Sequence, residues 1–247
     1  MTIESDAELQ GIREAGRVVA RTLNTLVPRV RPGVTTAELD RAALALLEQE
    51  GARSAPALEY GFPATVCISV NDEIVHGIPG RRVLRAGDLV TVDVTAEKDG
   101  FVADAARTVV VAHPSRAKRR LVRCARAAFA EAMRVARAGY RVRDIGAAIE
   151  RTVERFGLTV IRDLHGHGVG RRIHEDPTVP GYYDAANDRP LEPGLVLAIE
   201  PLVSAGSGFT RLLADGWTVS TRDGSLSAHH ENTVVVTAGP PLVVTAG

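Results

Sequence analysis

Two aspartates, Asp93 and Asp104, stand on either side of a turn signal, Lys98-Asp99-Gly100. The flanking segments, 89–95 and 101–111, are rich in apolar and β-branched residues, which predicts a β-hairpin. For either two-residue turn, 98–99 or 99–100, residues 93 and 104 project from the same face. Two carboxylates on one face repel each other unless a cation or a proton lies between them. We interpret the pair as a metal site, with a shared proton or solvent exposure as the alternatives.

A second cluster lies in residues 164–177, where three histidines, His165, His167 and His174, occur among alternating glycines. Glycine lets the backbone approach a ligand or another strand closely. The glycines do not have the GxGxxG spacing of a dinucleotide-binding loop. A lone histidine is usually packed or surface-exposed, but three beside alternating glycines favour a functional segment.

Two glutamates complete the candidate site, because Glu200 ends one apolar segment and Glu231 opens another. With Asp93, Asp104 and one imidazole they would carry four negative charges, which two divalent cations would neutralise. Such an oxygen-rich set suits Mn, Fe, Co or Zn better than a thiolate zinc site does. A centre of two ions can hold and acidify a bridging water as the nucleophile.

Other chemistries have weak support in the sequence. It has neither a GxSxG motif nor a P-loop lysine, and Cys67 and Cys124 are interpreted as packing residues. The 30 basic and 30 acidic residues cancel, which disfavours a nucleic-acid partner, and the basic segment 116–126 is interpreted as a solvated helix face. No apolar run is long enough to span a membrane and the start does not resemble a signal peptide, so we expect no membrane association and a cytoplasmic protein.

The elements that must position these residues follow from apolar periodicity and from cap and breaker residues. We predict helices over 6–26, 35–51, 115–138 and 142–156, with Thr35 and Glu38 forming a capping box. Strands are predicted over 65–70, 89–95, 101–111, 195–199, 217–221 and 231–237. The order is helix, helix, strands, and then the same order again.

The two halves of the chain can be aligned directly. At an offset of 106, Gly33, Glu38, Leu39 and Gly51 match Gly139, Asp144, Ile145 and Gly157, and at 107 Asp93 matches Glu200. This favours a diverged duplication. We therefore expect an α+β fold in one domain, residues 1–247, made of halves of about 1–112 and 113–247. The two strand-end carboxylates would face each other across a pseudo-two-fold axis.

Six motifs in this chain resemble those of the type I methionine aminopeptidases. They are segments 61–71, 75–79, 93–108, 166–177, 198–201 and 217–237, and the resemblance spans roughly residues 5–240. It implies the pita-bread fold, in which two pseudo-two-fold-related αβ halves surround a curved antiparallel sheet. It also implies removal of the initiator methionine from peptides and nascent proteins whose second residue is small.

The resemblance further implies a role for each matching residue. Asp93 would chelate one of two divalent ions, His167 and Glu200 would bind the other, and Asp104 and Glu231 would bridge both. Glu200 would also relay a proton from the metal-held water.

The substrate side of the site is implied in the same way. His76 and His174 would contact the peptide and stabilise the tetrahedral intermediate. The methionine pocket would include Phe62, Cys67, Ile173 and Trp217. Partners would be peptides and nascent chains with N-terminal methionine, with the ribosome as a further candidate, and we expect a monomer.

The chain departs from the family pattern at four positions: Glu59 replaces the usual Tyr and Tyr60 the usual His, Ile173 replaces Phe, and Asn232 replaces His. His165 is an additional histidine. The departures near the pocket leave open a paralogue with altered specificity. A non-catalytic peptide- or ribosome-binding relative is the other alternative, but such relatives typically lose metal ligands, and all five matching positions are present here.

Overall fold

The fold is built around one long antiparallel hairpin, which carries both aspartates. In the computed structural model, which describes residues 1–246, β4 (Leu89–Lys98) pairs with β5 (Phe101–Val110) over their whole length. Lys98 pairs with Phe101, so the turn is Asp99-Gly100, and both turn residues have positive φ (50° and 80°). This backbone matches the right-handed twist of the strands. Asp93 lies opposite Ala106 and Asp104 opposite Thr95, so the two carboxylates share a face as predicted.

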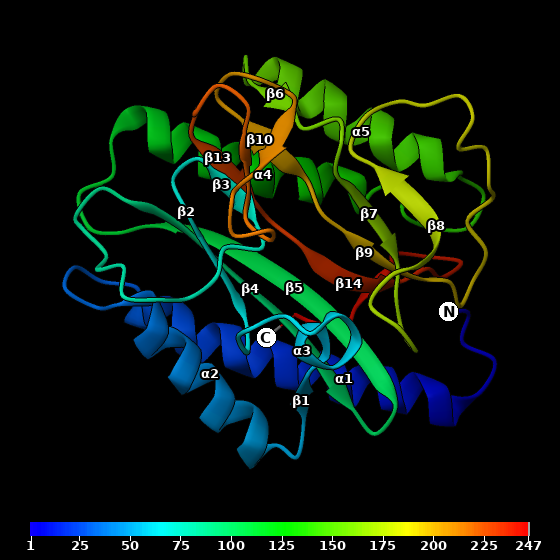
Figure 1. The fold of residues 1–247 in the computed structure, drawn as a ribbon. Coiled ribbons are helices and arrows are strands. Elements are labelled where there is room, and N and C mark those ends of the chain that lie inside the picture. The colour runs from blue at the N-terminus through cyan, green and yellow to red at the C-terminus, as the bar shows by residue number, and fades with distance from the viewer. Residues whose placement is uncertain (247) are drawn as a thin grey trace.

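Two helices of the N-terminal half cover one side of this hairpin. α1 (Asp6–Leu26) begins where the Ser5 side chain accepts a hydrogen bond from Glu8, and α2 (Thr36–Gln49) begins with the predicted Thr35–Glu38 capping box. Their apolar faces are buried against β2 (Cys67–Val70), β4 and β5 in one hydrophobic cluster. Figure 1 shows both helices, in blue, along the lower side of the hairpin.

The C-terminal half repeats this arrangement on the opposite side of the molecule. α4 (Arg116–Ala132) and α5 (Val142–Arg155) pack against strands of the second half in a separate hydrophobic cluster (Figure 1). Adding 106 to the bounds of α2 gives those of α5, which agrees with the repeat seen in the sequence.

The helix predicted over 115–138 is shorter than expected. α4 ends at Ala132, and the following residues form tight turns, in which the Arg137 N–H donates to the Val135 carbonyl at 2.8 Å. The Ala138 N–H then donates to the Thr237 carbonyl at 2.9 Å. The backbone is thus redirected to pair with the distant end of the sheet, which no local periodicity signals.

Two larger sheets carry the candidate residues, and all their strand pairs are antiparallel. The first contains β1 (Arg53–Ser54), β4, β2 and β5. The second has the order β15 (Leu242–Val243), β14 (Asn232–Val235), β9 (Val196–Ile199), β7 (His165–Gly168) and β8 (Glu175–Pro180). They meet where Arg107 bridges to His230 and the Glu231 N–H donates to the Ala106 carbonyl at 3.0 Å.

Short elements complete the fold. The helices are η1 (Val27–Arg29) and α3 (Ala55–Tyr60), and the strands are β3 (Glu73–Val75), β6 (Thr159–Val160), β10 (Leu202–Ser204), β11 (Thr210–Leu212), β12 (Val219–Thr221) and β13 (Ser227–His229). The sequence did not predict α3 or β3. Among residues 1–246, no helix is long and apolar enough to cross a membrane. The α+β class is confirmed, while the single-domain boundaries stay a prediction.

Candidate metal centre

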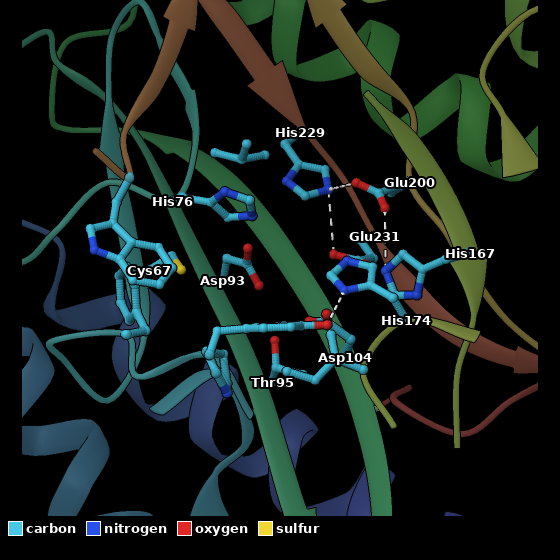
Figure 2. A pocket seen from close by; sticks show the side chains of 16 residues that line it. Cys67, His76, Asp93, Thr95, Asp104, His167, His174, Glu200, His229 and Glu231 are labelled. Carbon is cyan, nitrogen blue, oxygen red and sulfur yellow. Dashed lines mark hydrogen bonds and ion pairs between the residues drawn. The ribbon is translucent and has the colours of Figure 1, made fainter. Parts of the chain in front are cut away.

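A cavity of about 270 Å³ lies where the two sheets meet. All eleven residues that the sequence singled out for metal, catalysis or substrate line it: Phe62, Cys67, His76, Asp93, Asp104, His167, Ile173, His174, Glu200, Trp217 and Glu231. Figure 2 shows the acidic and imidazole side chains turned toward one another from opposite walls. The structure thus brings the predicted residues together in one cavity.

The four carboxylates come from four different places in the fold. Asp93 lies on β4 and Asp104 on β5, while Glu200 directly follows β9 and Glu231 directly precedes β14. Asp104 is only 6% exposed and Glu231 only 2%. Buried carboxylates need a partner, yet Asp93 Oδ1, Asp104 Oδ1 and Glu231 Oε1 have no hydrogen-bond partner among the described residues.

Burial and mutual repulsion disturb the ionisation of this cluster when no cation is present. Burial, and then the neighbouring Asp104, raises the pKa of Asp93 well above its usual value. Burial, and then Glu231, does the same to the pKa of Asp104. The pKa of Glu231 rises to about 8, first through burial and then through Glu200. Such a cluster is stable in its ionised form only when positive charge lies within it.

The donor atoms are spaced to surround cations. Ligand atoms of Asp104, His167 and Glu231 all lie within 4.8 Å of one another, and so do those of Asp93, His229 and Glu231. Glu231 belongs to both groups, whereas Asp104, to which the resemblance also assigns a bridging role, belongs to one. Carboxylate and imidazole donors of this kind suit divalent transition metals. The residues present therefore fit a centre of two such ions.

His167 is oriented by its own strand. On β7 its Nδ1 pairs with the Gly168 carbonyl at 2.9 Å, so Nδ1 carries the proton and Nε2 is free to act as a ligand. Nε2 lies 3.6 Å from Glu200 Oε1. The flanking glycines are required by close packing, since a Cβ on Gly166 would lie 2.5 Å from the Ala198 carbonyl oxygen and one on Gly168 2.3 Å from that of Asp176.

The exposed His76 and His174 stand at the rim of the cavity. Desolvation, and then the nearby His167, lowers the pKa of His174 to about 4, so its ring is neutral at neutral pH. The Tyr60 hydroxyl lies 2.7 Å from His174 Nδ1. Glu59 and Ile173, which both depart from the family pattern, are also in contact. The Ile173 N–H donates a hydrogen bond to Glu59 Oε1 at 3.0 Å.

An apolar wall closes one end of the cavity. Phe62 and Trp217 pack edge to face with ring centroids 5.3 Å apart. Cys67 and Ile173 are 5% and 3% exposed. Burial, and then the nearby Asp93, raises the pKa of the Cys67 thiol well above its usual value, so this residue is a neutral part of the wall.

His229 is the residue that the sequence reasoning missed. It is 2% exposed and also lines the cavity, together with Pro56, Tyr60, Val75 and Thr95. His165 does not line this cavity and pairs instead with the Tyr182 hydroxyl at 3.3 Å. Asn232 accepts hydrogen bonds from Arg107 and Thr245 and is likewise outside the cavity lining.

Comparison with known proteins places this site in a family. The sequence profile of "Metallopeptidase family M24" matches residues 10–238. The chain belongs to metallopeptidase family M24. It is therefore a peptide-bond hydrolase that uses metal.

Individual M24 relatives are similar over nearly the full length. The chain is 43% identical to "Methionine aminopeptidase" of Clostridium perfringens over 243 residues, 98% of each chain. The crystal structure of the methionine aminopeptidase from Thermotoga maritima matches with a TM-score of 0.96 at 36% identity, covering all of both chains. The predicted resemblance and the pita-bread fold are thereby confirmed. The prolidase from Pyrococcus furiosus shares the fold alone, at 20% identity and a TM-score of 0.79, over 66% of its own length.

Proposed function

We propose that this chain hydrolyses the first peptide bond of peptides and nascent proteins that begin with methionine and have a small second residue. The observation that carries the proposal is one cavity that joins two surfaces. One surface is a buried acidic cluster with unpartnered oxygens, and the other is an apolar wall. The similarity to methionine aminopeptidases over the whole chain supports the same reading.

Five residues would hold two divalent ions: Asp93, Asp104, His167, Glu200 and Glu231. Two such ions would supply Lewis acidity toward the scissile carbonyl and would lower the pKa of a water used as nucleophile. The choice among Mn, Fe, Co and Zn depends on supply as well as on ligand type.

Three side chains would act on the substrate and the proton. Glu200 is 10% exposed and faces both His167 and His229, so its carboxylate is held where it can accept a proton and pass it to the departing amine. His174 is neutral and, with Tyr60 donating to Nδ1, carries its proton on Nε2. Nε2 then donates a hydrogen bond to the carbonyl oxygen as negative charge develops there. His76 stands on the same rim and would contact the peptide.

The apolar wall would select the first side chain. Phe62, Cys67, Ile173 and Trp217 offer a neutral surface to an unbranched thioether chain, which fills irregular apolar space well. Aliphatic Ile173 stands where the family usually has Phe, so the pocket differs in shape. We propose that methionine remains the preferred residue.

The test uses protein stripped of metal and resupplied with Mn(II) or Co(II), with Met-Ala-Ser as substrate. We expect hydrolysis only with metal, and at least about a hundredfold loss in Asp104→Asn, which keeps the volume but removes a bridging charge. Asp99→Asn, on the exposed hairpin turn, is the matched control and keeps full activity.

Leu-Ala-Ser and Ala-Pro-Ser are assayed beside it. Equal or faster cleavage of either peptide would overturn the methionine preference and favour a paralogue with altered specificity. A folded, metal-loaded protein that cleaves none of the three would overturn the whole proposal. We further propose that the chain acts as a monomer in the cytoplasm on chains emerging from the ribosome, where substrates with N-terminal methionine arise.

A further inference from the structure

His229 has no role in the function proposed above, yet it is the most deeply buried histidine of the cavity. Its side chain is 2% exposed, and both ring nitrogens lack a hydrogen-bond partner among the described residues. An imidazole with two unsatisfied nitrogens is costly in a protein interior. Figure 2 shows the ring directed at Glu200 and Glu231 rather than into the core.

The backbone of His229 is locked to the hairpin that carries the aspartates. Its N–H donates to Thr108 Oγ1 at 2.8 Å, and the same hydroxyl donates to the His229 carbonyl at 2.8 Å. Thr108 is in turn paired with Thr91 at 2.7 Å. The imidazole is therefore held in a fixed place relative to Asp93 and Asp104 before any ion binds.

The distance from the ring to Glu231 is that of a co-ligand. His229 Nε2 lies 3.4 Å from Glu231 Oε2, which belongs to the same group of donor atoms, and it lies equally far from Glu200 Oε2, which would bind the other ion. A hydrogen bond from nitrogen to oxygen is shorter, about 2.7–3.2 Å. Two donor atoms bound to one ion at about 2.1 Å lie about 3.0 Å apart at a right angle and about 3.4 Å apart at a tetrahedral angle. The spacing between His229 and Glu231 thus fits two donor atoms that share a cation.

We propose that His229 is a sixth ligand of the metal centre and binds the ion on the Asp93 side. Asp93, His229 and Glu231 form one group of donor atoms within 4.8 Å, and Asp104, His167 and Glu231 form the other. Each ion would then have one imidazole, whereas the family resemblance supplies only His167. This inference rests on the two-ion centre proposed above and adds one ligand to it.

A nitrogen donor changes the selectivity of the Asp93-side ion. Imidazole favours Fe, Co, Ni and Zn, whereas an all-oxygen site suits Mn and Mg. His229 would therefore raise the affinity of that position for the later transition metals relative to Mn.

The first experiment counts imidazole ligands by zinc X-ray absorption on protein loaded with two zinc ions. We expect an average of about one imidazole per zinc in the unaltered chain and about half of one in His229→Gln. His167→Gln is the matched variant and is also expected to give about half. A count of one half in the unaltered chain, unchanged in His229→Gln, would overturn the proposal. The imidazole count of the unaltered protein is sufficient to test the proposal, so the test remains valid even if a variant folds poorly.

The second experiment titrates each metal-free protein with Co(II) and with Mn(II) by calorimetry, after circular dichroism has shown that the variant is folded. His229→Gln is expected to weaken one of two Co(II) sites at least about tenfold and to change Mn(II) binding much less. Equal weakening for both metals would mean that His229 only positions the glutamates, and would overturn its role as a ligand. Neither measurement depends on peptide hydrolysis, so failure of the proposed activity would be seen separately.

Discussion

The hydrogen bond between Tyr60 and His174 holds the exposed His174 ring at the rim of the cavity. The two groups are 2.7 Å apart, and their rings lie with centroids at 5.7 Å. We propose that the phenol donates to Nδ1, which leaves the proton of the neutral imidazole on Nε2. Tyr60 is therefore a positioning residue for His174.

Removing this hydroxyl tests that role. We expect Tyr60→Phe to lower kcat for Met-Ala-Ser about tenfold with little change in KM, because the lost interaction matters most when charge develops on the carbonyl. Steady-state kinetics measures the split, and Tyr183→Phe, at a tyrosine 53% exposed outside the cavity lining, is the control. A rise in KM at constant kcat would show instead that Tyr60 only binds substrate.

Single residues also show how far the sequence predicts the site. Asp93 and Asp104 could be placed together because period-two strands and a short turn fix their faces, and the register confirms it. His229 could have been found by a similar rule, since it stands two residues before Glu231 and both side chains line the cavity, although Glu231 lies between β13 and β14. The sequence alone does not show which of the adjacent residues His229 and His230 turns its ring toward the cavity, so His229 was not predicted. Tyr60 could not be placed, because its contact with His174 spans 114 residues.

At the scale of elements, α4 is held to the sheet partly through His230. The side chain of His230 points away from the metal centre, and its ring packs edge to face on Phe129 of α4 with centroids 5.2 Å apart. Burial, and then the positive charge of Arg107, lowers the pKa of His230 to about 3. The folded protein therefore favours the neutral form of the His230 ring against α4.

The sign of the resulting pH dependence follows from linkage. An unfolded histidine takes up a proton near its ordinary pKa of 6.5, whereas the folded one stays neutral down to about 3. This contribution to the free energy of unfolding is complete above pH 6.5 and declines as the pH falls toward 3. Relative to His230→Gln, the unaltered chain should lose up to about 1.4 kcal/mol for each pH unit below 6.5.

Urea denaturation of metal-free protein at pH 7, 6 and 5 measures this difference. His113→Gln, on an exposed loop, is the control and should follow the unaltered chain. A constant difference between His230→Gln and the unaltered chain over this range would contradict the pKa argument.

Elements with strong local signals were predicted well, and those set by distant contacts were not. α1, α2 and α5 have clear apolar stripes and caps, and their predicted bounds agree with the structure to within two residues. α3 has only six residues and begins with Ala55-Pro56, so it lacks a periodic pattern long enough to detect. It contacts the distant 173–174 segment through Glu59 and Tyr60, and Ala55 is buried in a hydrophobic cluster with Ile173.

For the whole molecule, the proposed metal centre is the place where residues from the two halves of the chain meet. Asp93 and Asp104 come from the first half and His167, Glu200, His229 and Glu231 from the second, so each ion would join both halves. Thr233 of the second half also contacts the first half. Its hydroxyl accepts a hydrogen bond from the Asp104 N–H at 2.8 Å and donates one to the Asp104 carbonyl at 2.9 Å. Metal binding should therefore stabilise the fold as a unit, beyond its effect on catalysis.

The size of this stabilisation should depend on pH in a definite direction. Asp93, Asp104 and Glu231 have raised pKa values in the folded chain without cations, and that of Glu231 reaches about 8. An acid whose pKa is raised on folding contributes most stability below its unfolded value of 4.5, and this contribution is lost as the pH rises toward the folded value. Metal-free protein should therefore become less stable from pH 6 to pH 8, as the buried carboxylates ionise without a counter-charge.

Metal binding should stabilise the protein more at pH 8 than at pH 6, because the ionised carboxylates are then ligands. At free ion concentrations a hundredfold above Kd, we expect the metal to raise Tm by about 5–10 °C at pH 8, and by less at pH 6. Thermal melts with chelator or with Mn(II) at the two pH values measure this, and Asp104→Asn, with one fewer buried charge, should show a smaller loss between pH 6 and pH 8 when metal-free. An equal gain in Tm at pH 6 and pH 8 would contradict this prediction. It would mean that a positive group of the protein itself, such as protonated His229, already compensates the buried carboxylates when no metal is bound.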